Sequence, residues 1–319
     1  MDERAPTARQ IERLLSGLPS RFTRKEVSAE AGVSRELAER IWRALGFATL
    51  ADDAVAFSDA DVEALSRVRA MLDSGTFDEE SVVRMARALG QTTSRLAQWQ
   101  AEIVIGAMVP GGREPSAGDL DRVLETARTL LPDFERLLIH VWRAQLAAAS
   151  ARLLAVAAVG DEPVPIAVGF ADLVSFTRRS RDLPERDLAA LVEGFESRAA
   201  DVVAAHGARL VKTLGDEVLF TASTPAQAAA IALDLIDAEE LRVGLAYGPV
   251  LPMLGDVFGT TVNLAARLTA IAGPGMILTD DALAGALKGD RRFVVHRHRK
   301  RQARGLGVVR PHVLRRSAS

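Results

Sequence analysis

The sequence predicts an all-α N-terminal half followed by an α+β domain. Residues 1–107 show only the apolar spacing that is typical of helices. A stretch rich in Gly and Pro, VPGGREPSAGD at residues 109–119, then interrupts the pattern. From Ile166 onward, apolar runs rich in β-branched residues alternate with amphipathic stretches. The predicted divisions are an all-helical domain at residues 1–110, linker helices at 111–160 and a mixed domain at 161–319.

Composition narrows the class of protein. The chain has 319 residues, 48% of them hydrophobic, which is enough for two domains with substantial cores. The net charge of −2 supplies no field that would attract nucleic acid or a membrane surface. The absence of cysteine excludes disulfides, thiolate metal sites and cysteine nucleophiles. The most apolar run, residues 144–160, contains Gln145 and Arg152 and is too short to span a bilayer, so we expect a soluble cytoplasmic protein.

The N-terminal half carries recognisable helix boundaries. Residues 23–47 predict a helix, a turn containing glycine and a second helix, with Ser34 as its N-cap. A further helix is expected to begin at Ser58 and to end at Gly75. A long helical pattern covers residues 119–159. Pro132 is expected to split it, because proline removes a backbone donor.

The C-terminal half mixes hairpins with single strands and helices, which favours an α+β sheet over a purely parallel one. A tight turn at Gly215-Asp216 is expected to join two strands. Thr224 and Pro225 mark a helix start. The predicted order is strand 165–174, helix 183–207, strand pair 208–222, helix 224–237, strand pair 241–255, helix 259–273, strand 275–279, helix 280–287 and two final strands.

Several polar residues in this half have both an ordinary and a functional interpretation. Asp172 follows a predicted buried strand, where it is either a helix cap or part of an anion-facing turn with the SFT that follows. Asp216 is either a turn residue or a ligand, and Lys212 is either a solvated strand lysine or a binding residue. Asn263 and Arg267 are four residues apart on a predicted helix and therefore share a face. This face is either a polar surface stripe or a functional surface.

The C-terminal tail is strongly basic. From Arg291 to Ser319 there are ten Lys and Arg residues and no Asp or Glu. A solvated edge strand often carries such charge. Contact with a polyphosphate is the functional alternative.

The polar residues suit one chemistry when they are taken together. Two carboxylates near strand ends favour hard divalent cations, and paired cations favour displacement at phosphorus. An Asn/Arg pair suits charge that develops on a phosphate. Lys212 and Asp256 offer the donor and the acceptor that read a purine edge.

Residues 166–316 resemble the catalytic domain of class III nucleotidyl cyclases, on the motifs FADLVSFT, VKTLGDEVLF and GDVFGTTVNLAARL. The resemblance implies a ferredoxin-like type of sheet with packed helices. It also implies that two Mg²⁺ or Mn²⁺ ions bind between two aspartates. The implied roles are metal binding by Asp172 and Asp216, adenine selection by Lys212 and Asp256, ribose and transition-state contacts by Asn263 and Arg267, and a triphosphate contact by Arg304 in QARGLG.

The same resemblance implies an adenylyl cyclase. The Lys212/Asp256 pair stands where a guanylyl cyclase is expected to have a Glu/Cys-like pair, which favours ATP. The family fold implies a homodimer in which the metal-binding aspartates come from one protomer and the other groups from its partner. The implied reaction converts ATP into 3′,5′-cyclic AMP and pyrophosphate. Ser175 and Phe258 depart from the common pattern, although neither removes a functional group.

The N-terminal half resembles the autoinhibitory domain of pH-sensing actinobacterial adenylyl cyclases. The resemblance implies that this domain restrains the cyclase and that acid relieves the restraint. His140 in the linker and His206 at a helix end are candidate sensors, since histidine titrates near neutral pH. A packed or helix-end histidine is the ordinary alternative for both. A small ligand or lipid in this domain is a further possibility.

Residues 23–47 suggest a different class of function, because they resemble a MerR-type helix-turn-helix. The protein would then be a DNA-binding regulator with a catalytically silent cyclase-like module. Residues 1–110 contain 14 Lys and Arg against 17 Asp and Glu, an excess of three negative charges. Since DNA-binding faces carry a basic excess, this charge argues against nucleic acid as a partner.

Overall fold

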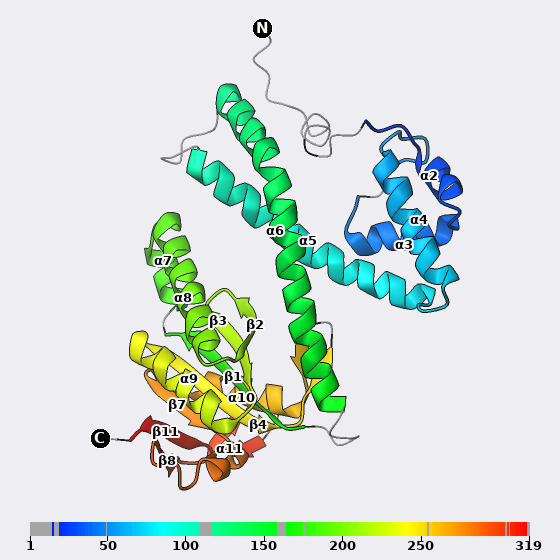
Figure 1. Ribbon diagram of the computed structural model, residues 1–319. Coiled ribbons are helices and arrows are strands. Elements are labelled where there is room, and N and C mark those ends of the chain that lie inside the picture. The colour runs from blue at the N-terminus through cyan, green and yellow to red at the C-terminus, as the bar shows by residue number, and fades with distance from the viewer. Residues whose placement is uncertain are drawn as a thin grey trace. The chain divides into compact units, whose positions relative to one another are not determined.

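The structure is a computed structural model (Figure 1). It describes Leu15, residues 19–48, 50–108, 116–157, 164–174, 176–253 and 255–303, Gly305, and residues 307–317. The chain divides into two compact units, Met1–Ser150 and Ala151–Ser319. Among the helices formed by the described residues, none combines the length and apolar character needed to cross a membrane.

The first unit is helical. It contains α2 (Arg24–Glu30), α3 (Arg35–Leu45), α4 (Asp59–Asp73), α5 (Glu79–Met108) and most of α6 (Ala117–Ala157). Buried apolar residues of α2, α3, α4 and α5 form one core. In this core the rings of Trp42 and Phe57 lie 4.6 Å apart. Phe22 and Phe57 also form an isolated antiparallel bridge.

The predicted helix starts of this unit are confirmed. The Ser34 hydroxyl accepts a hydrogen bond from the Leu37 N–H at 3.2 Å, and Ser58 forms a capping box with Asp61. Gly32 provides the left-handed turn residue between α2 and α3, with φ of 65°.

The expected break at Pro132 is wrong. Helix α6 runs without interruption for 41 residues and contains Pro132 in its interior. A proline there removes the hydrogen bond to the carbonyl four residues earlier, which belongs to Arg128. Arg128 is exposed, so water can replace the missing donor and the helix continues.

The second unit is built on a mixed seven-stranded sheet (Figure 1). Its order is β2-β3-β1-β4-β7-β11-β8. Strands β4 and β7 are parallel, and the other neighbours are antiparallel. The strands are β1 (Ile166–Leu173), β2 (Arg209–Leu214), β3 (Glu217–Ala222), β4 (Leu241–Gly248), β7 (Met276–Thr279), β8 (Phe293–Arg297) and β11 (His312–Arg316). The predicted mixed sheet with packed helices is confirmed.

Helices cover both faces of this sheet. Besides the short α7 (Phe176–Asp182) and α11 (Asp281–Ala286), the unit contains α8 (Glu185–Ala205), α9 (Pro225–Ala238) and α10 (Thr260–Ile271). Apolar residues of α8, α9 and α11 share a core with one set of strand residues. Ala265 of α10 packs with the strand residues that face the opposite side of the sheet, which include Val168 and Phe170. Gly244 of β4 has no room for a Cβ, because the backbone of α10 lies against it.

Two strand predictions need correction. The segment 241–255 does not form a hairpin, since β4 is already paired with β1 and β7 on its two edges. Strand β5 (Leu251–Met253) pairs with β6 (Asp256–Phe258) instead. The described residues of the tail form four strands and not two. Strands β8 and β11 extend the main sheet, while β9 (Arg301–Ala303) and β10 (Gly307–Val309) form a separate hairpin.

Candidate active site

A row of charged residues crosses the middle of the sheet at one end of β1. Asp172 lies opposite Glu217 of β3 and opposite Arg242 of β4. Cross-strand neighbours project from the same face, so the three side chains share one surface. Strand β1 ends at Leu173, within the predicted strand at 165–174, so Asp172 lies inside its strand and not just past it.

The β2–β3 turn brings Asp216 to this row. Gly215 has φ of 70°, which a tight hairpin turn requires at this point. The Leu173 N–H then donates to the Asp216 carbonyl at 2.9 Å, which ties the turn to the end of β1. Burial raises the pKa of Asp172, the Asp216 charge raises it further, and Arg242 opposes both. The structure therefore places the two predicted metal-binding aspartates together.

Glu217 is a site residue that the sequence analysis did not assign. Burial, and then the charges of Asp172 and Asp216, raise the pKa of Glu217 to about 7, while Lys212 opposes the rise. Burial is the main cause of this shift and the two neighbouring carboxylates add to it, so Glu217 belongs to the same charged cluster as Asp172 and Asp216. The available signal was an acidic residue directly after the Gly-Asp turn, at the start of an otherwise apolar strand.

The donor set fits divalent cations that are shared with a phosphate ligand. Among the described residues, no three His, Cys, Asp or Glu side chains are arranged to hold a metal ion by themselves. Mg²⁺ is commonly held by one or two carboxylates and completes its shell with water and substrate phosphates. Asp172 and Asp216 supply that number of carboxylates, and their mutual repulsion favours a cation between them.

Lys212 and Asp256 form the second part of the site. Lys212 Nζ donates to Asp256 Oδ2 at 2.5 Å, which links β2 to β6. Both side chains are half-buried. Burial on its own would raise the pKa of Asp256, but the hydrogen bonds from Lys212 and from the Val257 N–H lower it overall. The predicted donor–acceptor pair is therefore assembled within one chain.

Asn263 and Arg267 lie on the solvent side of α10. Both residues are exposed, whereas Ala265 and Leu268 of the same helix are buried. Within the described part of the chain, no hydrogen bond or ion pair connects either residue to Asp172 or Asp216. This protomer thus presents Asn263 and Arg267 outward.

The remaining predicted residues have other surroundings. His206 ends α8, and its Nε2 lies 2.7 Å from Asp234 Oδ2. His140 is exposed on α6. Arg304, the predicted triphosphate contact, and Ser175 lie outside the described residues.

Comparison with known proteins matches two family models to successive parts of the chain. Residues 4–148 match the adenylate cyclase regulatory domain, and residues 161–316 match the adenylate and guanylate cyclase catalytic domain. An adenylate cyclase of Streptomyces coelicolor is 43% identical over 98% of this chain and 90% of its own. An adenylate cyclase of Streptomyces griseus is 46% identical over 88% of this chain and 72% of its own.

A more distant relative is named for its sensitivity to pH. A pH-sensitive adenylate cyclase of Mycobacterium tuberculosis is 30% identical over 82% of this chain and 69% of its own. The similarity to these relatives extends over both halves of the chain. With both family matches and two relatives above 40% identity, the chain belongs to the adenylate cyclases, as a member in which a regulatory domain precedes a class III catalytic domain.

Proposed function

We propose that the chain converts ATP into 3′,5′-cyclic AMP and pyrophosphate, at sites completed by a second copy of itself. The observation that carries the proposal is the position of Asp172 beside Asp216 at the end of β1, with Glu217 and Arg242 as the cross-strand neighbours of Asp172. The crowded carboxylates suit a triphosphate that arrives with divalent cations, and the Lys212–Asp256 pair suits a nucleotide base.

Asp172 and Asp216 would hold two Mg²⁺ or Mn²⁺ ions. When bound, such ions neutralise the triphosphate and lower the pKa of the attacking ribose hydroxyl. The β1 pairing and the turn at Gly215 hold the two carboxylates in place before the nucleotide arrives. The contribution of the chain here is orientation, because a fixed carboxylate pair aligns the reacting oxygen and phosphorus.

Lys212 and Asp256 would select the base. Adenine presents an amino donor beside a ring-nitrogen acceptor, and the pair offers an acceptor beside a donor. In the free protein the two side chains satisfy each other, so the half-buried lysine is not left without a partner. This arrangement supports ATP as the substrate.

The outward position of Asn263 and Arg267 supports a two-fold dimer. A phosphate bound at Asp172 and Asp216 of one protomer would meet the exposed α10 face of the other. A two-fold axis makes both contacts reciprocal and creates two equivalent sites. Arg267 would then stabilise negative charge on the α-phosphate, Asn263 would orient the ribose, and Arg304 would contact the triphosphate.

We further propose that residues 1–110 restrain the catalytic domain through the linker at 111–160, and that acid relieves the restraint. Support comes from the regulatory-domain match and from the relative named as pH-sensitive. His206 is one candidate sensor, since it lies against Asp234, whose other partner is Arg316. His140 on α6 is the other.

A DNA-binding role has less support, although α2, Gly32 and α3 form a helix-turn-helix. Two arginines of α3 that could meet phosphates are engaged within the protein. Arg35 bridges Glu39 and Asp52, and Arg40 bridges Glu79 and Glu80. A steep fall in duplex affinity with added salt would favour this alternative.

The decisive experiment measures cyclic AMP formed from ATP by the purified full chain, from acid to neutral pH. Asp216→Ala is expected to abolish product formation. Asp237→Ala on α9 serves as the control, because Asp237 is an exposed aspartate that pairs with Arg316 and with none of the predicted site residues. A shortened chain that starts near residue 160 is expected to lose the pH dependence. Full activity of Asp216→Ala would overturn the metal assignment.

A further inference from the structure

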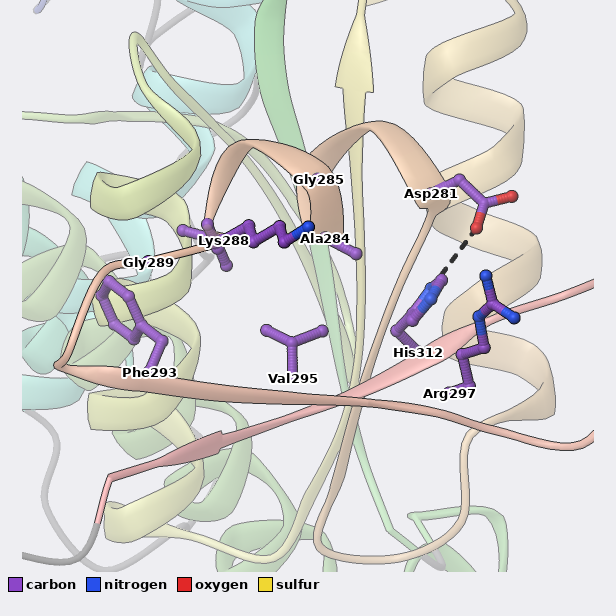
Figure 2. A pocket seen from close by; sticks show the side chains of 10 residues that line it. Asp281, Ala284, Gly285, Lys288, Gly289, Phe293, Val295, Arg297 and His312 are labelled. Carbon is purple, nitrogen blue, oxygen red and sulfur yellow. Dashed lines mark ion pairs between the residues drawn. The ribbon is translucent and has the colours of Figure 1, made fainter.

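A pocket lies at the outer edge of the catalytic sheet, between α11 and strands β8 and β11 (Figure 2). Its volume is about 520 Å³, which is in the range of small-molecule sites. The strand order places β4, β7 and β11 between β1 and β8. At roughly 4.8 Å per strand, the edge strand lies roughly 19 Å from the strand of Asp172. The pocket is therefore separate from the candidate active site.

One side of the pocket is apolar. Its lining includes Ala284 and Leu287 from the α11 segment and Phe293 and Val295 from β8. Figure 2 shows the Phe293 ring at one end and the Val295 side chain in the floor. Phe293 and Val295 are only partly covered by the main core of the unit. A hydrocarbon or aromatic ring placed over them would complete their burial.

The other side is polar and has an excess of positive charge. Lys288, Arg297 and His312 line it, and Asp281 is the one acidic residue among the described lining residues. Asp281 Oδ1 lies 3.6 Å from His312 Nδ1, and Figure 2 shows Arg297 beside this pair. No acidic side chain of the described residues forms a salt bridge with Lys288 or Arg297. Two permanent cations therefore face one carboxylate, whatever the charge of the imidazole.

We propose that this pocket binds a small amphipathic carboxylate. Its ring would lie over Phe293 and Val295, and its carboxylate would be held by Arg297 and attracted by Lys288. A guanidinium group matches a carboxylate through two parallel hydrogen bonds, which a point charge or a neutral amide does not reproduce. The apolar floor excludes water from one side of that contact and so strengthens it. The charge excess selects anions, and burial over the floor favours an anion with an apolar body over a small inorganic ion.

The test uses the full chain and 2-naphthoate as the probe, with binding measured by calorimetry. The expected result is one site per chain. The uncharged analogue 2-naphthamide is expected to bind at least about tenfold more weakly, since it lacks the charge-assisted contact. Inorganic phosphate, which has no apolar part, is expected to give no measurable heat. Absence of naphthoate binding, or equal binding of the amide, would overturn the proposal.

Substitutions of the pocket residues test whether naphthoate binds in this pocket. Arg297→Gln and Lys288→Gln are each expected to raise the Kd for naphthoate, the former by at least about tenfold. Both residues are exposed, so neither change removes core packing. Arg315→Gln is the matched control: Arg315 is an exposed arginine of β11, which pairs with β8, and it does not line the pocket. Val295→Trp is expected to fill the floor and abolish binding. A Kd that is unchanged in both charge variants places the probe elsewhere and contradicts the proposal.

Discussion

Lys212 Nζ lies 2.5 Å from Asp256 Oδ2, and this ion pair joins the hairpin strand β2 to the short strand β6. A β-irregularity between Leu210 and Lys212 changes the register just before the lysine. Such a change alters the direction in which a side chain points, compared with a regular β-ladder. The pair is therefore a product of tertiary structure, since the two residues are far apart in sequence and depend on separate strands.

Replacing Asp256 by asparagine keeps the size of the side chain and removes its charge. We expect the kcat/KM for ATP to fall about 10- to 100-fold, or about 1.4 to 2.7 kcal/mol, because the amide is a weaker acceptor for the adenine amino group. The preference for ATP over GTP should fall as well. Asp290→Asn is the control, since Asp290 also pairs with a basic side chain, that of Arg292, but precedes the edge strand β8. An unchanged ATP/GTP preference would contradict the assignment.

Divalent cations are expected to stabilise the folded protein through Asp172 and Asp216. A cation that binds only the native state adds about 2.7 kcal/mol at a concentration 100-fold above its Kd. Mn²⁺ should therefore raise the melting temperature of the wild type, and it should raise that of Asp237→Asn equally. Asp172→Asn and Asp216→Asn should each lose most of the increase, as followed by calorimetric scanning. An equal increase in all four proteins would exclude these aspartates as ligands.

Ionisation of Asp280 is expected to make the free energy of unfolding depend on pH. Asp280 caps α11 by accepting from the Leu283 N–H at 2.9 Å, and its pKa is raised by burial. A raised folded-state pKa means that its favourable contribution is present below the unfolded pKa and is lost as the pH rises through the folded pKa. Asp280→Asn keeps an acceptor but has no charge to bury. We expect its free energy of unfolding to exceed that of the wild type at neutral pH.

The measurement is urea unfolding of the full chain, at acid and at neutral pH. The advantage of Asp280→Asn should shrink in acid, where the wild-type carboxyl is protonated. Asp280→Ala, which removes the cap altogether, should be less stable than Asp280→Asn by about 1 kcal/mol at both pH values, since neither variant titrates at this position. A stability gain of Asp280→Asn that is the same at both pH values would show that ionisation of Asp280 is not its cause.

Local signals in the sequence were sufficient for helix starts and for the turn. Thr224 and Pro225 begin α9 as predicted, and Gly215-Asp216 forms the expected hairpin turn. These features depend on hydrogen bonds between residues a few positions apart, so a short segment contains all the required information.

Non-local pairing explains what the sequence could not predict. Whether β4 forms a hairpin with β5 depends on β1 and β7, which already occupy both of its edges. The same pairing sets Glu217 and Arg242 beside Asp172. The register between distant strands decides which charged residues share a face, and no local pattern encodes it.

The shared site gives the sharpest prediction. Asp172→Asn and Lys212→Met should each be inactive as homodimers. In their heterodimer, one site receives an intact aspartate pair from the Lys212→Met protomer and an intact lysine from its partner. Random mixing should therefore restore about a quarter of wild-type activity, since about half the dimers are mixed and each has one working site. Asp172→Asn mixed with Asp216→Asn should stay inactive, because both changes damage the same half of each site. Activity that is not restored in the first mixture would show that one protomer contains the whole site.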